Sequence, residues 1–125
     1  MNENELSRVI IDCAMKVHTE LGPGLLESVY EACLEFELRK KRISVERQKP
    51  IPVEYQDVKL DCGFRLDLFV EKKVIVELKA VDTLNDIHLA QTLTYLKLTQ
   101  CKLALLINFN VAHLKDGIKR VVNKL

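Results

Sequence analysis

Apolar side chains recur at helical spacing near the start of the chain, which predicts an amphipathic helix over residues 4–20. The members of this stripe are Leu6, Val9, Ile10, Cys13 and Val17. The Gly22-Pro23-Gly24 turn ends the pattern, because glycine and proline interrupt helices. A second apolar stripe predicts a helix over residues 25–41. Its members are Leu26, Val29, Cys33 and Phe36.

The middle of the chain has patterns typical of β-strands. Residues 44–55 include Pro50 and Pro52. Proline lacks the amide hydrogen that an interior strand needs, so we expect any strand there to lie at a sheet edge. Residues 58–70 and 74–80 predict the two arms of a β-hairpin.

The last third of the chain returns to a helix followed by a strand. Asn85 or Asp86 can cap a third helix that extends to about Thr99. Residues 102–109 predict a strongly apolar strand, and the ending GIKRVVN fits either a strand or a helix. The order of elements predicts an α/β domain over residues 1–125, in which helices flank one central mixed β-sheet.

The hairpin has a well-constrained register. If residues 71–73 form a three-residue loop, Val70 pairs with Val74, Asp67 lies opposite Glu77, and Arg65 lies opposite Lys79. The other face of the hairpin is then entirely apolar, and a slip of one residue would place charges in it. The residues of that face are Phe64, Leu66, Leu68, Val70, Val74, Val76, Leu78 and Ala80.

Two facing carboxylates destabilise a hairpin unless something offsets their charge. Asp67 and Glu77 would have β-carbons roughly 5 Å apart. Arg65 and Lys79, which lie diagonal to them, could complete a lattice of salt bridges on a solvated face. Alternatively, the carboxylates could hold a divalent cation such as Mg²⁺, which prefers oxygen ligands. The residues of the hairpin favour neither explanation over the other.

Composition excludes several classes of protein. Of the 125 residues, 48% are hydrophobic and 30% are charged, which is an ordinary balance for a soluble domain. No apolar run is long enough to cross a membrane, and the polar N-terminus is unlike a secretory signal, so we expect a cytoplasmic protein. Four scattered cysteines without a Cys-x-x-Cys pair predict reduced, buried thiols and no zinc site.

The net charge of +1 favours no particular partner. A protein that binds duplex nucleic acid often has a basic excess, so any such contact must come from a local patch. One candidate is the run from Arg39 to Arg42, and the other is the C-terminal set Lys115, Lys119, Arg120 and Lys124. Each alone is slightly better explained as a solvated helix end or tail.

An aspartate followed ten residues later by Glu-x-Lys, on the two arms of a hairpin, resembles the PD-(D/E)XK nuclease superfamily. The start of the second helix, with Gly24, Glu27 and Tyr30, resembles the GxxExxY family within that superfamily. The third helix carries Gln91 and Tyr95, similar to the Gln-x-x-x-Tyr element of the RecB-like branch. One departure is that Leu66, rather than proline, precedes Asp67.

The resemblance implies a restriction-endonuclease-like fold and a Mg²⁺- or Mn²⁺-dependent nuclease that hydrolyses phosphodiester bonds, with DNA as the expected nucleic acid. Asp67 and Glu77 would hold the metal, and Lys79 would orient the attacking water. Glu27 would complete the ligand set, within about 8 Å of both carboxylates. The implied catalytic residues are therefore Lys79, Asp67, Glu77 and Glu27.

The resemblance also implies that Tyr30, Gln91 and Tyr95 position the backbone or the metal ligands without binding the metal themselves, with Tyr30 lining the same cleft. Each of these residues has an ordinary alternative, and Glu27 could simply interact with the dipole at the start of its helix. A catalytically inactive nucleic-acid-binding or assembly module with the same fold is the alternative function. A domain this small would cover few base pairs, so we also expect a homodimer or a partner protein.

Overall fold

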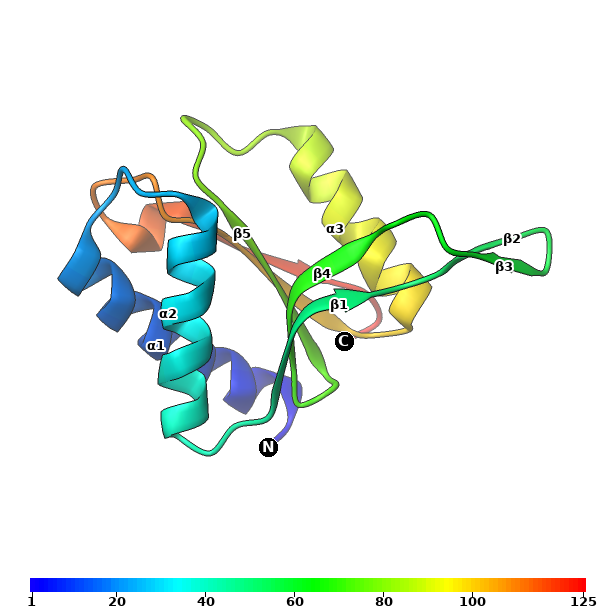
Figure 1. Cartoon of the computed structure of the whole chain (residues 1–125), viewed down its shortest axis with the longest axis horizontal. Coiled ribbons are helices and arrows are strands. Elements are labelled where there is room, and N and C mark those ends of the chain that lie inside the picture. Colours follow the sequence, from blue (N-terminus) through cyan, green and yellow to red (C-terminus); the bar gives the residue numbers. More distant parts are fainter.

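The computed structural model describes residues 1–125, and its first two helices pack together on one face of the sheet (Figure 1). Helix α1 (Glu3–Leu21) begins with a capping box, in which the Glu5 amide donates to Asn2 Oδ1 at 2.8 Å and the Asn2 amide donates to the Glu5 carboxylate at 3.0 Å. It ends at Gly22, whose φ of 69° suits glycine. Helix α2 (Glu27–Lys40) follows after a short turn.

The other main elements are the strands β1 (Val45–Pro50), β4 (Arg65–Val70), β5 (Val74–Lys79), β6 (Leu103–Asn108) and β7 (Ile118–Val122), with helix α3 (Asp86–Thr99) between β5 and β6 and the short 3₁₀ helix η1 (Leu114–Gly117) between β6 and β7. The five strands form the central sheet, in the order β1-β4-β5-β6-β7. Only β5 and β6 are parallel, because helix α3 connects them; the other neighbours are antiparallel. The mixed sheet is therefore confirmed, and so is the edge position of the proline-containing strand, because β1 ends at Pro50 and lies at one edge of the sheet.

Two hydrophobic cores lie on opposite faces of the sheet. The larger core contains 20 buried residues and joins α1 and α2 to the sheet. The smaller contains six and joins α3 to the other face through Tyr95 and Leu96. This arrangement of helices on both faces of a mixed sheet is consistent with the restriction-endonuclease-like fold predicted from the sequence.

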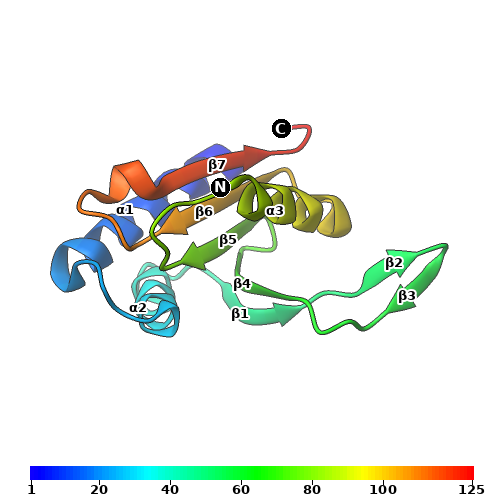
Figure 2. The same ribbon diagram turned by 90° about the horizontal axis from the view of Figure 1, so that it is seen from above.

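The predicted long strand over residues 58–70 is wrong. Strands β2 (Val53–Tyr55) and β3 (Val58–Leu60) pair with each other in a separate two-stranded ribbon that projects from the body of the protein (Figure 2). Gly63, with a φ of 75°, interrupts the strand, and its amide donates to Asp61 Oδ1 at 3.2 Å. Cys62 is exposed on this connection, so the prediction that all four free cysteines are buried is also wrong.

The predicted apolar face of the hairpin is wrong at one end. Leu68 and Val70 pack in the core with α1 and α2, whereas Leu66 packs in the core with α3. Phe64 also lies on the α3 side, where its ring meets Tyr95 edge-on with centroids 6.0 Å apart. Strand β4 therefore changes face between Leu66 and Leu68, around Asp67.

No helix of the chain combines the length and the apolar character that crossing a bilayer requires.

Candidate functional site

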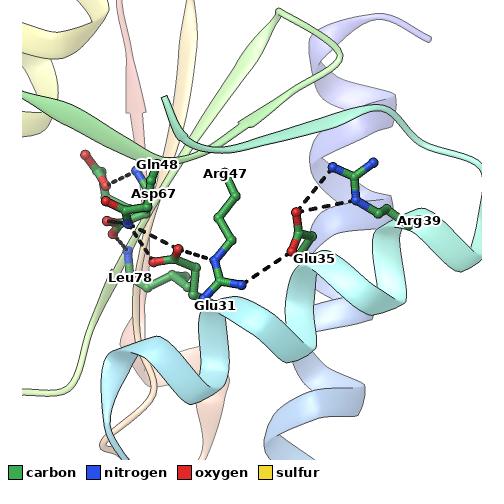
Figure 3. A network of polar contacts seen from close by, with 8 residues as sticks. Glu31, Glu35, Arg39, Arg47, Gln48, Asp67 and Leu78 are labelled. Atoms are coloured by element: carbon green, nitrogen blue, oxygen red, sulfur yellow. Dashed lines mark hydrogen bonds and ion pairs between the residues drawn. The ribbon is translucent and has the colours of Figure 1, made fainter. Parts of the chain in front are cut away.

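Asp67 and Glu77 meet where strands β4 and β5 separate. The register predicted from the alternation is confirmed, with Val70 opposite Val74, but backbone pairing stops at Leu68 and Val76. Beyond that point side-chain carboxylates accept the strand amides. The Leu78 amide donates to Asp67 Oδ2 at 2.8 Å (Figure 3). The Asp67 amide donates to Glu77 Oε2 at 3.2 Å. Each carboxylate therefore accepts a hydrogen bond from a backbone amide, and these bonds hold both side chains at the opening between the strands.

Burial and the neighbouring aspartate make Glu77 a weak acid. Its side chain is only 6% exposed. Burial raises the pKa of Glu77 to about 9, and the negative charge of Asp67 adds to this effect. The Asp67 amide and the charge of Lys79 act in the opposite direction with smaller effect. Glu77 consequently carries a proton at neutral pH in the metal-free protein.

Tyr95 lies on the α3 side of this pair. Its pKa is raised, first by burial and then by the negative charges of Glu77 and Asp67. The phenol therefore keeps its proton at any physiological pH and is available as a hydrogen-bond donor. Gln91, one turn earlier on α3, is exposed, and its side chain makes no hydrogen bond within the chain.

The salt-bridge lattice considered for this face is absent. The ion pairs of the protein lie elsewhere, and none involves Asp67, Glu77, Arg65 or Lys79. Lys79 is partly buried two residues after Glu77, and its ammonium group has no carboxylate within ion-pair distance. The repulsion between the two carboxylates is therefore relieved by protonation of Glu77 and not by fixed cations.

Glu27 lies at the end of strand β5 and not on a remote surface. The Ala80 amide donates to Glu27 Oε2 at 3.2 Å. The amides of Leu78 and Ala80 are two residues apart on one edge of β5, so they lie roughly 7 Å from each other. Asp67 and Glu27 thus accept alternate amides along the same strand edge, while Glu27 stays exposed to solvent.

Tyr30 does not line a cleft, and that expectation is wrong. The side chain is completely buried, and its ring stacks on Phe109 with centroids 4.5 Å apart. Its hydroxyl donates to the Gly22 carbonyl at 2.6 Å and accepts from the Leu25 amide at 3.1 Å. Tyr30 therefore holds the turn before α2, and this turn sets where Glu27 begins the helix.

Three residues that the sequence analysis missed adjoin the site. Glu31, on α2, is 5% exposed and accepts a hydrogen bond from Arg47 Nε at 2.7 Å. Gln48 Nε2 donates to the Glu31 oxygens at 3.0 and 3.1 Å and approaches Asp67 Oδ1 at 3.4 Å (Figure 3). One signal was present in the sequence: Glu31 falls three and seven residues before Leu34 and Leu38, on the buried stripe of its helix, where a charge needs a partner.

The donor set at the strand opening consists of carboxylate oxygens, the kind of ligand that hydrated divalent cations take. No group of three or more histidine, cysteine, aspartate or glutamate side chains is arranged to hold a metal, so Asp67, Glu77 and Glu27 are not gathered into one cluster. Mg²⁺, however, keeps several waters and is commonly bound by one or two carboxylates together with substrate phosphates. Asp67 and Glu77 supply two such carboxylates, and a cation there would replace the proton that Glu77 now carries.

A family model described as the PD-(D/E)XK nuclease superfamily matches residues 4–121. No curated protein and no solved structure matches the chain. The matched range contains the whole central sheet apart from the last residue of β7, together with all of α2 and α3 and all of α1 except its first residue.

Proposed function

Because the chain belongs to the PD-(D/E)XK nuclease superfamily, we propose that it hydrolyses phosphodiester bonds of nucleic acid, with DNA as the substrate. Proteins of this superfamily generally use divalent metal ions, and we propose Mg²⁺ or Mn²⁺ here. The observation that carries the proposal is the Asp67–Glu77 pair at the strand opening, where each carboxylate accepts a backbone amide. We assign the activity to one domain over residues 1–125.

Asp67 and Glu77 would hold the cation. When bound, a divalent ion polarises a phosphate oxygen and lowers the pKa of a bound water. Lys79 has no ion-pair partner, so its ammonium group is free to orient the attacking water and to offset the negative charge that develops on the phosphate. Glu27 would contribute through a bridging water, since its carboxylate lies further along the edge of β5.

Finer placement within the superfamily rests on two helices. Gly24, Glu27 and Tyr30 match the pattern of the GxxExxY family, and the burial of Tyr30 gives that pattern a physical reason, because the tyrosine fixes the turn before Glu27. Gln91 and Tyr95 match the element of the RecB-like branch. The raised pKa of Tyr95 supports a role beside the carboxylate pair as a donor to a phosphate or water.

Local charge supports a nucleic-acid contact at one corner of the protein. Lys97, Lys102 and Lys124 line a surface hollow that contains no carboxylate, and none of the three forms an ion pair. The other basic run is partly neutralised, because Arg39 pairs with Glu35 and Lys40 pairs with Glu37. We therefore propose that Lys97, Lys102 and Lys124, and not residues 39–42, contact the phosphate backbone of the nucleic acid.

A binding or assembly module without turnover is the second candidate. The projecting ribbon of β2 and β3 favours it, because a two-stranded ribbon this short is barely stable alone and exposes three apolar side chains that a homodimer or a partner protein could cover. These side chains are Tyr55, Val58 and Leu60.

A cleavage assay separates the two candidates. Labelled single- and double-stranded DNA and RNA are incubated with the protein in Mg²⁺, in Mn²⁺ and in EDTA. The nuclease proposal predicts metal-dependent cleavage of DNA, whereas the binding module predicts retention of intact nucleic acid under every condition. Metal-independent cleavage would point to a contaminating enzyme, and an Asp67→Asn preparation purified in parallel detects it.

A further inference from the structure

The side-chain amide of Gln48 lies between two carboxylates from different parts of the fold. Its Nε2 is 3.0 and 3.1 Å from the two oxygens of Glu31 on α2, and 3.4 Å from Asp67 Oδ1 on β4. Both neighbours accept hydrogen bonds, so the nitrogen and not the oxygen of the amide must face them. An NH₂ group has two hydrogens, which is one for each carboxylate.

The backbone of strand β1 is distorted at this residue. Gln48 has a φ of 54°, in the left-handed region that residues other than glycine rarely adopt, least of all within a strand. The β1–β4 ladder pairs Arg47 with Leu68 and Lys49 with Leu66 but does not pair Gln48 with Asp67. The irregular backbone therefore falls beside Asp67, where the side chain of Gln48 takes the place of the missing backbone contact.

The far end of this bridge is anchored. Glu31 is buried and accepts from Arg47 Nε at 2.7 Å, and this hydrogen bond raises the pKa of Arg47. Arg47 also lies 3.6 Å from Glu35, so α2 and β1 are tied together on both sides of Glu31. Gln48 consequently reaches Asp67 from a fixed support.

We propose that Gln48 is a positioning residue that fixes the orientation of the Asp67 carboxylate at the proposed cation site; this inference rests on the proposed function. Gln48 holds Oδ1 of Asp67 and the Leu78 amide holds Oδ2, so neither oxygen is free to rotate away from the strand opening. The strained backbone at Gln48 is retained because an ordinary extended residue would direct its side chain elsewhere.

The substitution Gln48→Gly separates this role from a purely structural one. Glycine adopts a positive φ readily, so the backbone of β1 is preserved while the bridge is lost. A matched control is available in Gln56→Gly: Gln56 is also a glutamine with a left-handed φ, 51°, but it lies in the exposed turn between β2 and β3. Both variants remove the same atoms from the same backbone conformation.

Two measurements are made on the wild type and on both variants. In metal-free buffer, hydrogen exchange of the Leu78 amide, followed by NMR, reports whether Asp67 Oδ2 still accepts its hydrogen. We expect exchange at Leu78 to rise about tenfold in Gln48→Gly, with the Val74 and Val76 amides unchanged. Calorimetric titration with Mn²⁺ reports cation affinity, which should fall about 10- to 100-fold in Gln48→Gly. Gln56→Gly should match the wild type in both.

The outcomes distinguish the inference from the function on which it rests. Unchanged exchange at Leu78 in Gln48→Gly overturns the positioning role, whatever the titration gives. Faster exchange with unchanged Mn²⁺ affinity overturns the link to cation binding. A wild type that binds no Mn²⁺ while Gln48→Gly shows faster Leu78 exchange rejects the proposed metal site and leaves the positioning of Asp67 by Gln48 standing. Equal effects of Gln48→Gly and Gln56→Gly would contradict the specific role of Gln48.

Discussion

Replacing Glu77 with glutamine should stabilise the metal-free protein, which is unusual for a buried residue of a candidate active site. The pKa of Glu77 is raised from 4.5 to about 9 in the folded protein. The folded state therefore binds the proton more tightly than the unfolded state does. The stability that comes with neutral Glu77 is fully present below pH 4.5 and is lost progressively as the pH rises toward 9.

The size of the effect at neutral pH follows from this shift. In the unfolded chain Glu77 has its ordinary pKa of 4.5, so at pH 7 it is ionised, and this ionisation lowers the free energy of the unfolded state. At about 1.4 kcal/mol for each pH unit above 4.5, the unfolded state is favoured by about 3 kcal/mol at pH 7. Glutamine keeps the shape of protonated glutamate, and its side-chain oxygen can still accept the hydrogen bond from the Asp67 amide, but it cannot ionise in the unfolded chain. Glu77→Gln should thus raise the free energy of unfolding by about 3 kcal/mol at pH 7 and by little at pH 4.

Urea denaturation in EDTA at pH 4, 7 and 8.5 measures this difference directly. The control is Glu54→Gln, because Glu54 is exposed on the β2–β3 ribbon and forms no ion pair. Equal stability of Glu77→Gln and wild type at pH 7, or a gain that does not depend on pH, would refute the reasoning. Loss of stability at pH 7 would show that an ionised Glu77 has a favourable partner.

Two further predictions concern the metal and the lysine. Mn²⁺ affinity should rise about tenfold per pH unit between pH 6 and 8, because the cation must displace the proton on Glu77; calorimetry in two buffers of different ionisation enthalpy should show release of one proton, and an affinity that is flat over this interval would contradict the site. Lys79→Met should lower the single-turnover rate by about 100-fold or more while changing Mn²⁺ affinity less than about threefold, and a large loss of affinity with an unchanged rate would remove Lys79 from the chemical step.

The sequence predicted the Asp67–Glu77 pair because side chains of a β-strand alternate between its two faces with a period of two residues. Alternation of apolar residues placed Val70 opposite Val74, and the same register brought Asp67 to Glu77, with Lys79 two residues further along. The helices were equally accessible, since their apolar stripes and caps are local features. Asn85 caps α3 as expected, with the His88 amide donating to Asn85 Oδ1 at 3.0 Å.

The parts that sequence analysis missed depend on contacts between distant segments. The change of face in β4 between Leu66 and Leu68 accompanies the left-handed backbone of Gln48 on the neighbouring strand. Glutamine has no preference for a positive φ, so the sequence gives no indication of this conformation. The bridge from Glu31 through Gln48 to Asp67 joins residues 17 and 19 positions apart.

Tyr30 shows why a matched motif does not settle a residue's environment. Its spacing from Glu27 suggested a residue lining the same cleft, but the ring belongs to the core beside Phe109. Complete burial of an aromatic ring stabilises the folded protein, provided that the tyrosine hydroxyl has hydrogen-bond partners. The hydroxyl of Tyr30 has two such partners in the turn before α2. The motif therefore marks how the helix is positioned and not only what reaches the substrate.

The central claim is that Asp67 and Glu77 bind a divalent cation that the protein uses to cleave nucleic acid. The most direct measurement is single-turnover cleavage of labelled DNA by the wild type and by Asp67→Asn, prepared identically and assayed in Mg²⁺ and in EDTA. Asp67→Asn keeps the shape of the side chain and removes the charge that attracts the cation. The account predicts cleavage by the wild type in Mg²⁺ alone, with Asp67→Asn reduced to the EDTA background. Equal Mg²⁺-dependent cleavage by both proteins would contradict it.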